Sequence, residues 1–296
     1  SDFGEMTRLT EIAKPDYCVI TNIGQCHLEN LGSREGILKA KTEIFKSMNP
    51  DGYVFLNGED DMLATVKKPW NNEIIRFGMS KKDAVYATDV VNKGLLGSEA
   101  VIHVADTQFQ VKVPLPGVHM VLNALAATAV GWQLGLTTEQ IAEGIAQVQA
   151  VAGRSHVIET PDYILIDDCY NANPVSMKAA IDLLGTALQR KVAILGDMFE
   201  LGKDEATLHA QIGEYAMTHG VDVLICIGEL SKHMYDRAVE TSSGKEHGSR
   251  EIYYFPTREE AMAQLPHILH TGDAVLIKAS HSMKFEEIVE QSTGRI

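Results

Sequence analysis

Four short apolar runs in the second half of the chain each end in glycine or polar residues. They are residues 163–166, 192–195, 223–227 and 274–277. Continuous apolar runs of this length are typical of parallel strands that helices cover on both faces. A segment with helical spacing of its apolar residues follows each run, which predicts an α/β fold with a parallel sheet.

The densest polar cluster directly follows the first of these runs. Residues 167–174 are DDCYNANP, and a segment with apolar residues at helical spacing comes next. Asn173 suits the N-cap of that helix and Pro174 its first position. Because open α/β sheets bind ligands at the carboxyl ends of their strands, the cluster predicts a binding site at this edge.

Length and charge narrow the class of protein. The chain has 296 residues, which favours two domains, and we place them at residues 1–150 and 151–296 because helices end near Gly153. The formal net charge of −14 argues against nucleic acid and against an anionic membrane surface as partners. No apolar run reaches the about 18 residues of a membrane span, so no membrane insertion is expected.

The four cysteines fit a reducing compartment. They are Cys18, Cys26, Cys169 and Cys226, and no two of them form a CxxC pair. Cys18 and Cys226 lie in apolar runs, where a free cysteine behaves as a small hydrophobic residue. The pattern favours reduced thiols in a cytoplasmic protein.

The first half mixes strands and helices. We expect strands at residues 17–23 and 53–57 and a helix at 33–47. Residues 73–113 alternate in short runs, which predicts antiparallel strands. Helices are expected at 119–134 and 137–147, the second with a capping box formed by Thr137 and Gln140.

Four residues outside the polar cluster are candidates, each with a structural alternative. His27 follows a strand end and is either a metal ligand or a structural loop histidine. Lys41 alone fits a solvated helix lysine. Asn123 disfavours the helix interior, so it needs either a buried hydrogen bond or a ligand. Arg154 could bind phosphate or pair with a surface acid.

Six strings along the chain together resemble the Mur ligase family, the ATP-dependent amide ligases of peptidoglycan precursor synthesis. The strings are ITNIGQCHLENLGSREGILKAKTEIF (20–45), LPGVH with NALAA (115–127), GR (153–154), DDCYNANPVSM (167–177), ILGDMFELG (194–202) and LIKASHSM (276–283). Within the family, they resemble the branch that joins D-alanyl-D-alanine to UDP-N-acetylmuramoyl-tripeptide.

The resemblance implies a three-domain enzyme of which this chain is a fragment. Residues 1–150 would be the later part of a central P-loop-type ATPase domain, and residues 151–296 a Rossmann-like C-terminal domain that binds the dipeptide. The chain contains no GxxxxGK[ST] string. The resemblance places that P-loop, a UDP-binding domain and an acidic magnesium ligand upstream of residue 1, so we expect the chain alone to be inactive.

The resemblance also implies roles for single residues. His27 would bind Mg²⁺, and Lys41 would carry a carbamate that helps to hold a second Mg²⁺. The residues that would contact ATP are Asn123, Arg154 and Asp168, with Tyr170, Asn171 and Asn173 beside Asp168. Lys278 and Ser280 would face the incoming dipeptide. Many members have arginine where this chain has His281.

Two other functions remain open on the sequence. One is another Mur-type or folylpolyglutamate-synthase-like ligase, which would take a different acceptor. The other is a non-catalytic module that binds acceptor or nucleotide without ATPase activity. The acceptor specificity would distinguish the first alternative from a D-alanyl-D-alanine ligase. Phosphate release from ATP would distinguish an enzyme from the second alternative.

Overall fold

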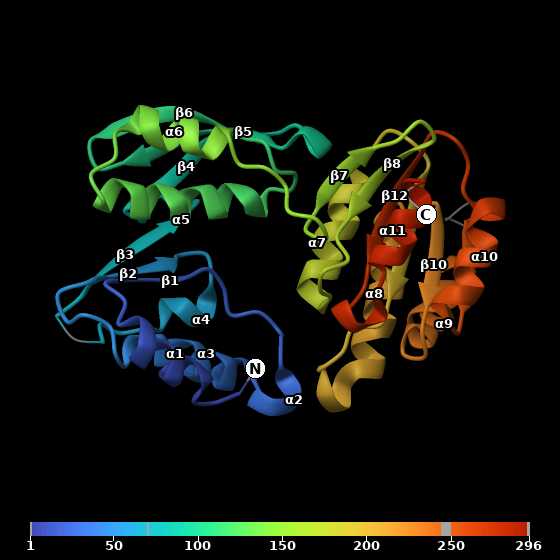
Figure 1. Cartoon of the computed structure of the whole chain (residues 1–296), viewed down its shortest axis with the longest axis horizontal. Coiled ribbons are helices and arrows are strands. Elements are labelled where there is room, and N and C mark those ends of the chain that lie inside the picture. Colours follow the sequence, from blue (N-terminus) through green and yellow to red (C-terminus); the bar gives the residue numbers. More distant parts are fainter. Residues whose placement is uncertain (1, 70, 244–249, 295–296) are drawn as a thin grey trace. The chain divides into compact units, whose positions relative to one another are not determined.

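The computed structural model describes residues 2–69, 71–243 and 250–294. The chain divides into two compact units, Ser1–Gln149 and Ala150–Ile296. Each unit contains one sheet of six strands with helices on both faces (Figure 1). The α/β fold class predicted from the apolar runs is therefore confirmed.

The sheet of unit 1 keeps its strands in sequence order. The strands are β1 (Tyr17–Ile20), β2 (Tyr53–Asn57), β3 (Glu73–Gly78), β4 (Val85–Asn92), β5 (Ser98–Val104) and β6 (Thr107–Val113). The antiparallel pairing expected for residues 73–113 holds for β4, β5 and β6. It is wrong for β3, which pairs in parallel with both β2 and β4.

Both faces of this sheet are covered because its strands alternate between two cores. In β2, Val54 and Leu56 pack into the cluster with α3, whereas Phe55 packs against α5. The helices are α1 (Glu5–Ala13), α2 (Leu28–Leu31), α3 (Arg34–Thr42), α4 (Asp61–Ala64), α5 (His119–Gln133) and α6 (Thr138–Ala146). The expected capping box of Thr137 and Gln140 is present at α6. The helix expected at 33–47 ends as a 3₁₀ helix, η1 (Glu43–Phe45).

The sheet of unit 2 is parallel except at one edge. Its order is β11-β10-β9-β12-β8-β7, and only the edge pair of β7 and β8 is antiparallel among the described strands. The strands are β7 (His156–Glu159), β8 (Tyr163–Asp167), β9 (Lys191–Gly196), β10 (Val223–Ile227), β11 (Glu251–Phe255) and β12 (Asp273–Lys278). The four apolar runs are thus β8, β9, β10 and β12, as predicted.

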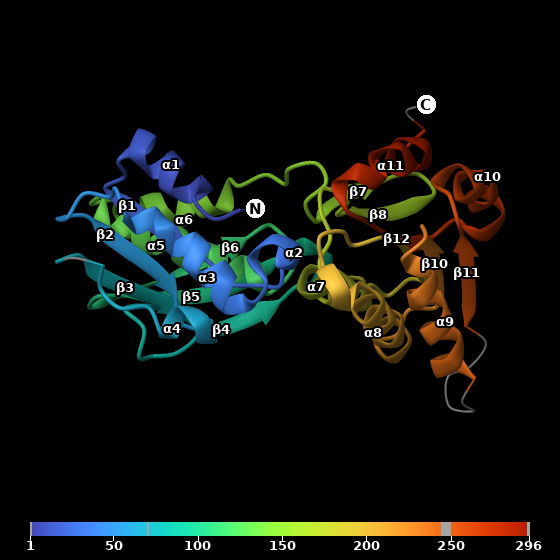
Figure 2. The same cartoon turned by 90° about the horizontal axis from the view of Figure 1, so that it is seen from below.

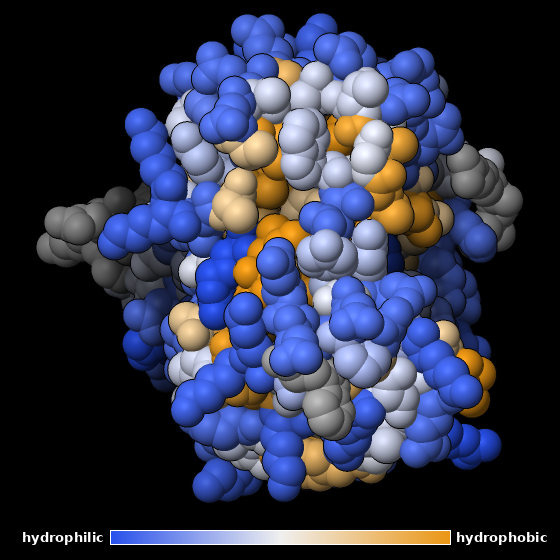
Figure 3. All heavy atoms as spheres, turned by 90° about the vertical axis from the view of Figure 1, so that its left-hand side faces the viewer, coloured by the Kyte–Doolittle hydropathy of each residue, from blue (hydrophilic) through white to orange (hydrophobic). Residues whose placement is uncertain are grey.

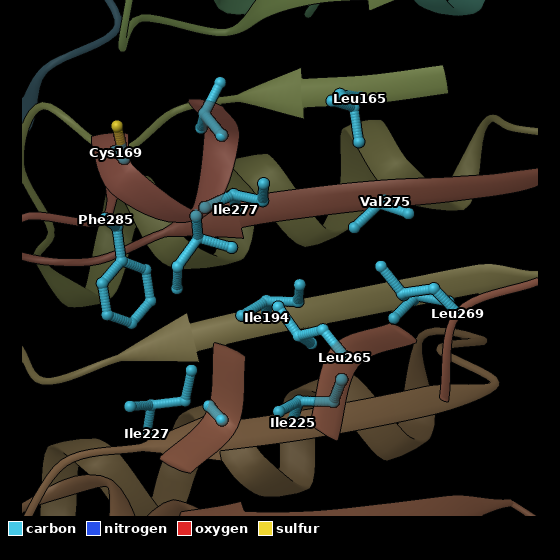
Figure 4. Packing of buried hydrophobic residues seen from close by; sticks show 14 of the residues in the cluster. Leu165, Cys169, Ile194, Ile225, Ile227, Leu265, Leu269, Val275, Ile277 and Phe285 are labelled. Carbon is cyan, nitrogen blue, oxygen red and sulfur yellow. The ribbon is translucent and has the colours of Figure 1, made fainter. Parts of the chain in front are cut away.

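Helices cover both faces of this second sheet (Figure 2). One face carries α7 (Pro174–Gly185), α8 (Glu205–Thr218) and α9 (Ser231–Ser242), and the other carries α10 (Arg258–Ile268) and α11 (Glu286–Ser292). Figure 4 shows alternate residues of the central strands, including Ile194, Ile225 and Val275, packed with Leu265 and Phe285 from the second helix layer. This packing fixes the strand ends that carry the polar residues.

Hydrophilic residues dominate the face drawn in Figure 3, with smaller hydrophobic areas between them. In the part of the chain that the structure describes, every helix is too short or too polar to cross a lipid bilayer.

Candidate functional site

Polar residues and one glycine lie at the carboxyl ends of four neighbouring strands in unit 2. Asp168 follows β8, Lys278 ends β12, Asp197 follows β9 and Gly228 follows β10. The chain passes from β8 through α7 to β9, and β12 later fills the place between these two strands. Open α/β sheets bind ligands at the carboxyl edge where the order of the strands reverses in this way.

An ion pair joins the first two of these strand ends. Lys278 is only 2% exposed, and its Nζ lies 2.6 Å from Oδ2 of Asp168. Nζ also donates to the carbonyl oxygens of Asp168 at 3.3 Å and Asn171 at 2.8 Å. The ammonium group has three protons, so its donors are all used within the chain. In this structure Lys278 therefore supports the loop after β8.

Asp167 at the end of β8 and Asp168 just after it anchor the segment that precedes β7. Oδ1 of Asp168 accepts from the amide of Ser155 at 2.8 Å, and Oδ2 of Asp167 accepts from the amide of Gly153 at 2.8 Å. Gly153 has φ +77°, a conformation that favours glycine, and a Cβ there would lie 3.1 Å from Tyr170 Cβ. The arrangement holds Arg154, between the two anchored amides, at a defined place.

Arg154 lies on an aromatic ring. Its guanidinium carbon is 4.1 Å from the ring centroid of Tyr170, which is 48% exposed. On the same loop cluster, the rings of Tyr170 and His281 are 5.4 Å apart. A cation on an exposed ring keeps its N–H donors open to a ligand. Of the residues predicted to contact ATP, Arg154 has the geometry that best suits an anion.

The side chains of the two asparagines in the cluster accept hydrogen bonds from nearby backbone amides. Oδ1 of Asn173 accepts from the amide of Ser176 at 2.9 Å, so Asn173 is the N-cap of α7, and Pro174 begins that helix, as predicted. Asn171 is exposed, and its Oδ1 accepts from the amide of Ala172 at 2.8 Å. The Asn173 carboxamide oxygen is committed to its cap, whereas Asn171 lies at the surface.

Cys169, between these polar residues, is not placed as a nucleophile. Its Sγ is buried and donates to Oδ1 of Asp167 at 3.0 Å. Burial, together with this carboxylate, raises the pKa of the Cys169 thiol well above its usual range. The thiol is therefore protonated and supports the strand end.

A second group of contacts ties the loop after β9 to its neighbours. Oδ1 of Asp197 accepts from the amide of Ser231 at 2.7 Å and from its hydroxyl at 2.6 Å, and so caps α9 from outside that helix. A Cβ on Gly228 would lie 2.5 Å from Asp197 Oδ2. Ser280, expected to face the dipeptide, is 5% exposed, and its Oγ accepts from the amide of Phe199 at 2.9 Å.

Sequence reasoning gave no role to Asp197, although the residue lies just after the apolar run 192–195, and it missed His209. His209 is buried on α8 and binds the backbone of the loop after β9. The one available signal was a histidine on an apolar helix face, with Ile212 three positions further on. Such a pattern predicts a buried core residue, but it does not show which backbone group hydrogen-bonds to the imidazole ring.

In unit 1 the candidates His27 and Lys41 lie around the loop that follows β1. Nζ of Lys41, on α3, donates to the carbonyl oxygen of Asn22 at 3.0 Å. His27 precedes α2 and has φ +54°. Among the described residues, no group of three or more His, Cys, Asp or Glu side chains could hold a metal ion. His27 and an unmodified Lys41 thus do not form a magnesium site by themselves.

Asn123 lies on the exposed side of α5. Its side chain is exposed, and its Nδ2 lies 3.3 Å from the sulfur of Met120. Of the two reasons considered for an asparagine in this helix, a buried hydrogen bond is therefore wrong. The exposed carboxamide stays available to a ligand.

Comparisons with known proteins cover nearly the whole chain. Residues 1–131 match the Mur ligase middle domain, and residues 153–281 match the Mur ligase, glutamate ligase domain. The UDP-N-acetylmuramoyl-tripeptide–D-alanyl-D-alanine ligase of Bacillus subtilis is 32% identical over 97% of this chain and 61% of its own length. The protein of the same name from Escherichia coli is 30% identical over 97% of this chain and 62% of its own length.

Solved structures give the same result. MurF from Acinetobacter baumannii aligns with a TM-score of 0.87 and 28% identity, over 99% of this chain and 63% of its own. MurF from Thermotoga maritima, solved in complex with ADP, aligns with a TM-score of 0.83 and 26% identity, over 99% of this chain and 65% of its own. The chain thus spans about three fifths of the length of these relatives. With both family domains matched and in this order, the chain belongs to the Mur ligase family.

Proposed function

We propose that the chain is part of an ATP-dependent ligase that joins D-alanyl-D-alanine to UDP-N-acetylmuramoyl-tripeptide in the cytoplasm, a step of peptidoglycan synthesis that serves cell shape and division. The relatives that carry this name support the proposal. Residues 1–150 would be the later part of the central ATPase domain, and residues 151–296 the acceptor-binding domain. The observation that carries it is Arg154, stacked on Tyr170 at the carboxyl edge of the sheet.

The chemistry of such a ligase explains why an open cation is needed. The terminal carboxylate of the tripeptide attacks the terminal phosphorus of ATP, so that an acyl phosphate forms and ADP leaves. The amine of the dipeptide then attacks the acyl carbon, loses a proton, and phosphate leaves. Carboxylate and ATP are both anions, so cationic groups must lower their repulsion. Arg154 supplies one such charge, and Asn123 offers a carboxamide to the nucleotide.

The metal part of the proposal rests on a modification of the chain. Mg²⁺ supplies charge neutralisation to phosphoryl transfer when it is bound. His27 would be a ligand of one Mg²⁺, and a carbamate on Lys41 would supply anionic oxygens, which Mg²⁺ prefers to an amine, to a second Mg²⁺. The remaining ligands would come from ATP, water and protein groups other than these two.

The remaining cluster residues would act on the shape of the site. We propose that Asp168 and Lys278 act through the loop that carries Tyr170, because their charged groups meet each other in the interior. Ser280 would act through the loop after β9, whose Phe199 amide it accepts. Tyr170 and Asn171, both exposed on the same loop, would line the nucleotide.

The decisive assay compares acceptors. The complete product of the gene that encodes this chain is incubated with ATP, Mg²⁺ and UDP-N-acetylmuramoyl-tripeptide, and phosphate release is measured with D-alanyl-D-alanine or with single amino acids. We expect release with the dipeptide alone. Release with a single amino acid would favour another Mur-type or folylpolyglutamate-synthase-like ligase. Binding of ATP or dipeptide without release would favour the non-catalytic module.

Arg154→Ala is expected to reduce kcat/KM for ATP by about ten- to hundredfold. Hydrogen bonds to a charged group contribute about 1.5–3 kcal/mol, and each 1.36 kcal/mol is tenfold in rate. The melting temperature should change little, because an exposed cation–π contact contributes only about 0.5–1 kcal/mol. Arg237→Ala is the matched control, since Arg237 is an exposed arginine of α9 that pairs with Glu214. Equal kinetics of the two variants would rule out a phosphate contact at Arg154.

A further inference from the structure

His209 is a fully buried histidine whose two ring nitrogens both meet the backbone. It is 0% exposed, on the second turn of α8. Nδ1 lies 2.7 Å from the carbonyl oxygen of Glu205, which can only accept, so Nδ1 carries the proton. Nε2 lies 2.9 Å from the amide nitrogen of Met198, which can only donate, so Nε2 is the acceptor. These partners select one neutral tautomer.

The Met198 amide belongs to the loop at the carboxyl end of β9. The next amide of that loop, Phe199, donates to Oγ of Ser280 at 2.9 Å, and the Ser280 amide donates to the Asp197 carbonyl at 3.0 Å. The loop is therefore held by α8 on one side and by the end of β12 on the other. At its outer end Phe199 is 39% exposed, and Glu200 has φ +62°. A shift of the Met198 backbone would therefore also move Phe199, which lies at the exposed carboxyl edge of the sheet.

We propose that His209 is a positioning residue of the candidate site: its neutral ring holds the Met198 amide and so places Phe199 and Ser280 at the edge where the acceptor binds. The assignment of an acceptor to this edge rests on the proposed function. The histidine touches no ligand itself. It acts through a backbone amide of the loop.

The same geometry makes the contact sensitive to acid. A proton on Nε2 would set an N–H against the Met198 N–H, and the hydrogen bond would be lost. Burial lowers the pKa of His209, and the charge of His233 on α9 acts in the same direction, whereas the Glu205 carbonyl and the charges of Asp197 and Glu205 oppose it. The pKa of His209 is lower in the folded than in the unfolded chain. The contribution of this residue to the free energy of unfolding is therefore fully present above about pH 6.5 and decreases below that pH.

The test compares three variants of the complete gene product. His209→Phe keeps an aromatic ring but removes the acceptor, whereas His209→Gln retains an oxygen that can accept from Met198. His219→Phe is the matched control, because His219 is an exposed histidine at the other end of the same helix. We expect His209→Phe to raise KM for D-alanyl-D-alanine about tenfold, the effect of one lost buried hydrogen bond, with KM for ATP nearly unchanged.

Rescue and pH dependence separate positioning from simple loss of fold. His209→Gln should return KM for the dipeptide to within about threefold of the parent, because its acceptor is retained. The melting temperature of the unmutated protein should fall as the pH drops below about 6.5, and His209→Gln should flatten that fall. Equal KM values for His209→Phe and His219→Phe, or a fall in melting temperature that His209→Gln leaves unchanged, would overturn the proposal.

A readout without turnover distinguishes this inference from the proposed function. The amide resonances of Phe199 and Ser280 are compared by NMR in the 296-residue chain and its variants. We expect His209→Phe to shift both and His219→Phe to shift neither. If the parent lacks ligase activity but these shifts occur, the proposed function fails and the loop is still placed by His209. If the parent is active and the shifts are absent, the positioning role fails alone.

Discussion

Asp168→Asn is expected to lower the free energy of unfolding by about 3 kcal/mol, because removal of one partner of a buried ion pair leaves the other charge uncompensated. Lys278 is 2% exposed and has Asp168 Oδ2 at 2.6 Å, so water cannot replace the lost charge. The Asn side chain keeps the volume and one acceptor oxygen, which places the cost at the lower end of the range for such changes. The measurement is the denaturant midpoint with its slope.

An exposed ion pair provides the control. Glu214→Gln breaks the contact of Glu214 with Arg237, in which both side chains are exposed, and should cost no more than about 1 kcal/mol. Adding Lys278→Met to Asp168→Asn should recover part of the loss, because it removes the unpaired charge. If Asp168→Asn costs no more than the control, the pair is not a support of the fold. Asp168 would then regain the purely nucleotide-binding role that the resemblance implied.

The strands of unit 2 could be predicted because burial on both faces leaves a clear pattern. Residues 192–195 were expected and β9 covers Lys191–Gly196, and residues 223–227 match β10. The caps of α6 and α7 were also predictable, since a capping box depends on side chains only three positions apart. These features are local, so neighbouring residues contain the information that determines them.

The parallel pairing of β3 is a feature that local sequence patterns do not determine. Glu73–Gly78 was expected to join an antiparallel group, because short runs with alternating polarity are typical of one. The strand instead pairs in parallel with β2, since the chain crosses over through α4 between them. Strand direction in a sheet depends on the connection, and the alternation of polar and apolar residues does not contain it.

In the candidate site, too, some features could be predicted from the sequence and others could not. The sequence placed Asp168, Lys278 and Ser280 at strand ends, where they are. It could not show that β12 lies between β8 and β9, which makes Lys278 and Asp168 partners. A residue at the carboxyl edge can face a ligand or a neighbouring strand, and the choice depends on the sheet order. His209 was missed for a related reason, because its partner Met198 lies in a loop before the helix.

Lys41→Ala in the complete gene product is expected to have the largest effect on activity, a loss of kcat on the order of 10²- to 10³-fold, as for removal of one group that stabilises transition-state charge. The proposed modification joins the neutral Nζ of Lys41 to CO₂: a C–N bond forms, and one proton passes to solvent. The product is an anion beside the loop after β1, where Nζ now contacts the Asn22 carbonyl at 3.0 Å. Loss of that hydrogen bond alone should cost only about 1 kcal/mol of stability.

Three comparisons isolate the carbamate. Lys39→Ala changes an exposed lysine of the same helix α3 and should leave the rate near that of the parent. Lys41→Arg keeps the positive charge but cannot form the carbamate, so it should be as inactive as Lys41→Ala, and a short-chain carboxylate should partly restore Lys41→Ala. A readout besides activity is the carbamate carbon signal in NMR with isotope-labelled bicarbonate, which should disappear in both Lys41 variants. Retention of the signal in Lys41→Ala would place the modification on another amine, and near-parental rates of Lys41→Arg would show that the charge of the lysine, and not a carbamate, is what the reaction needs.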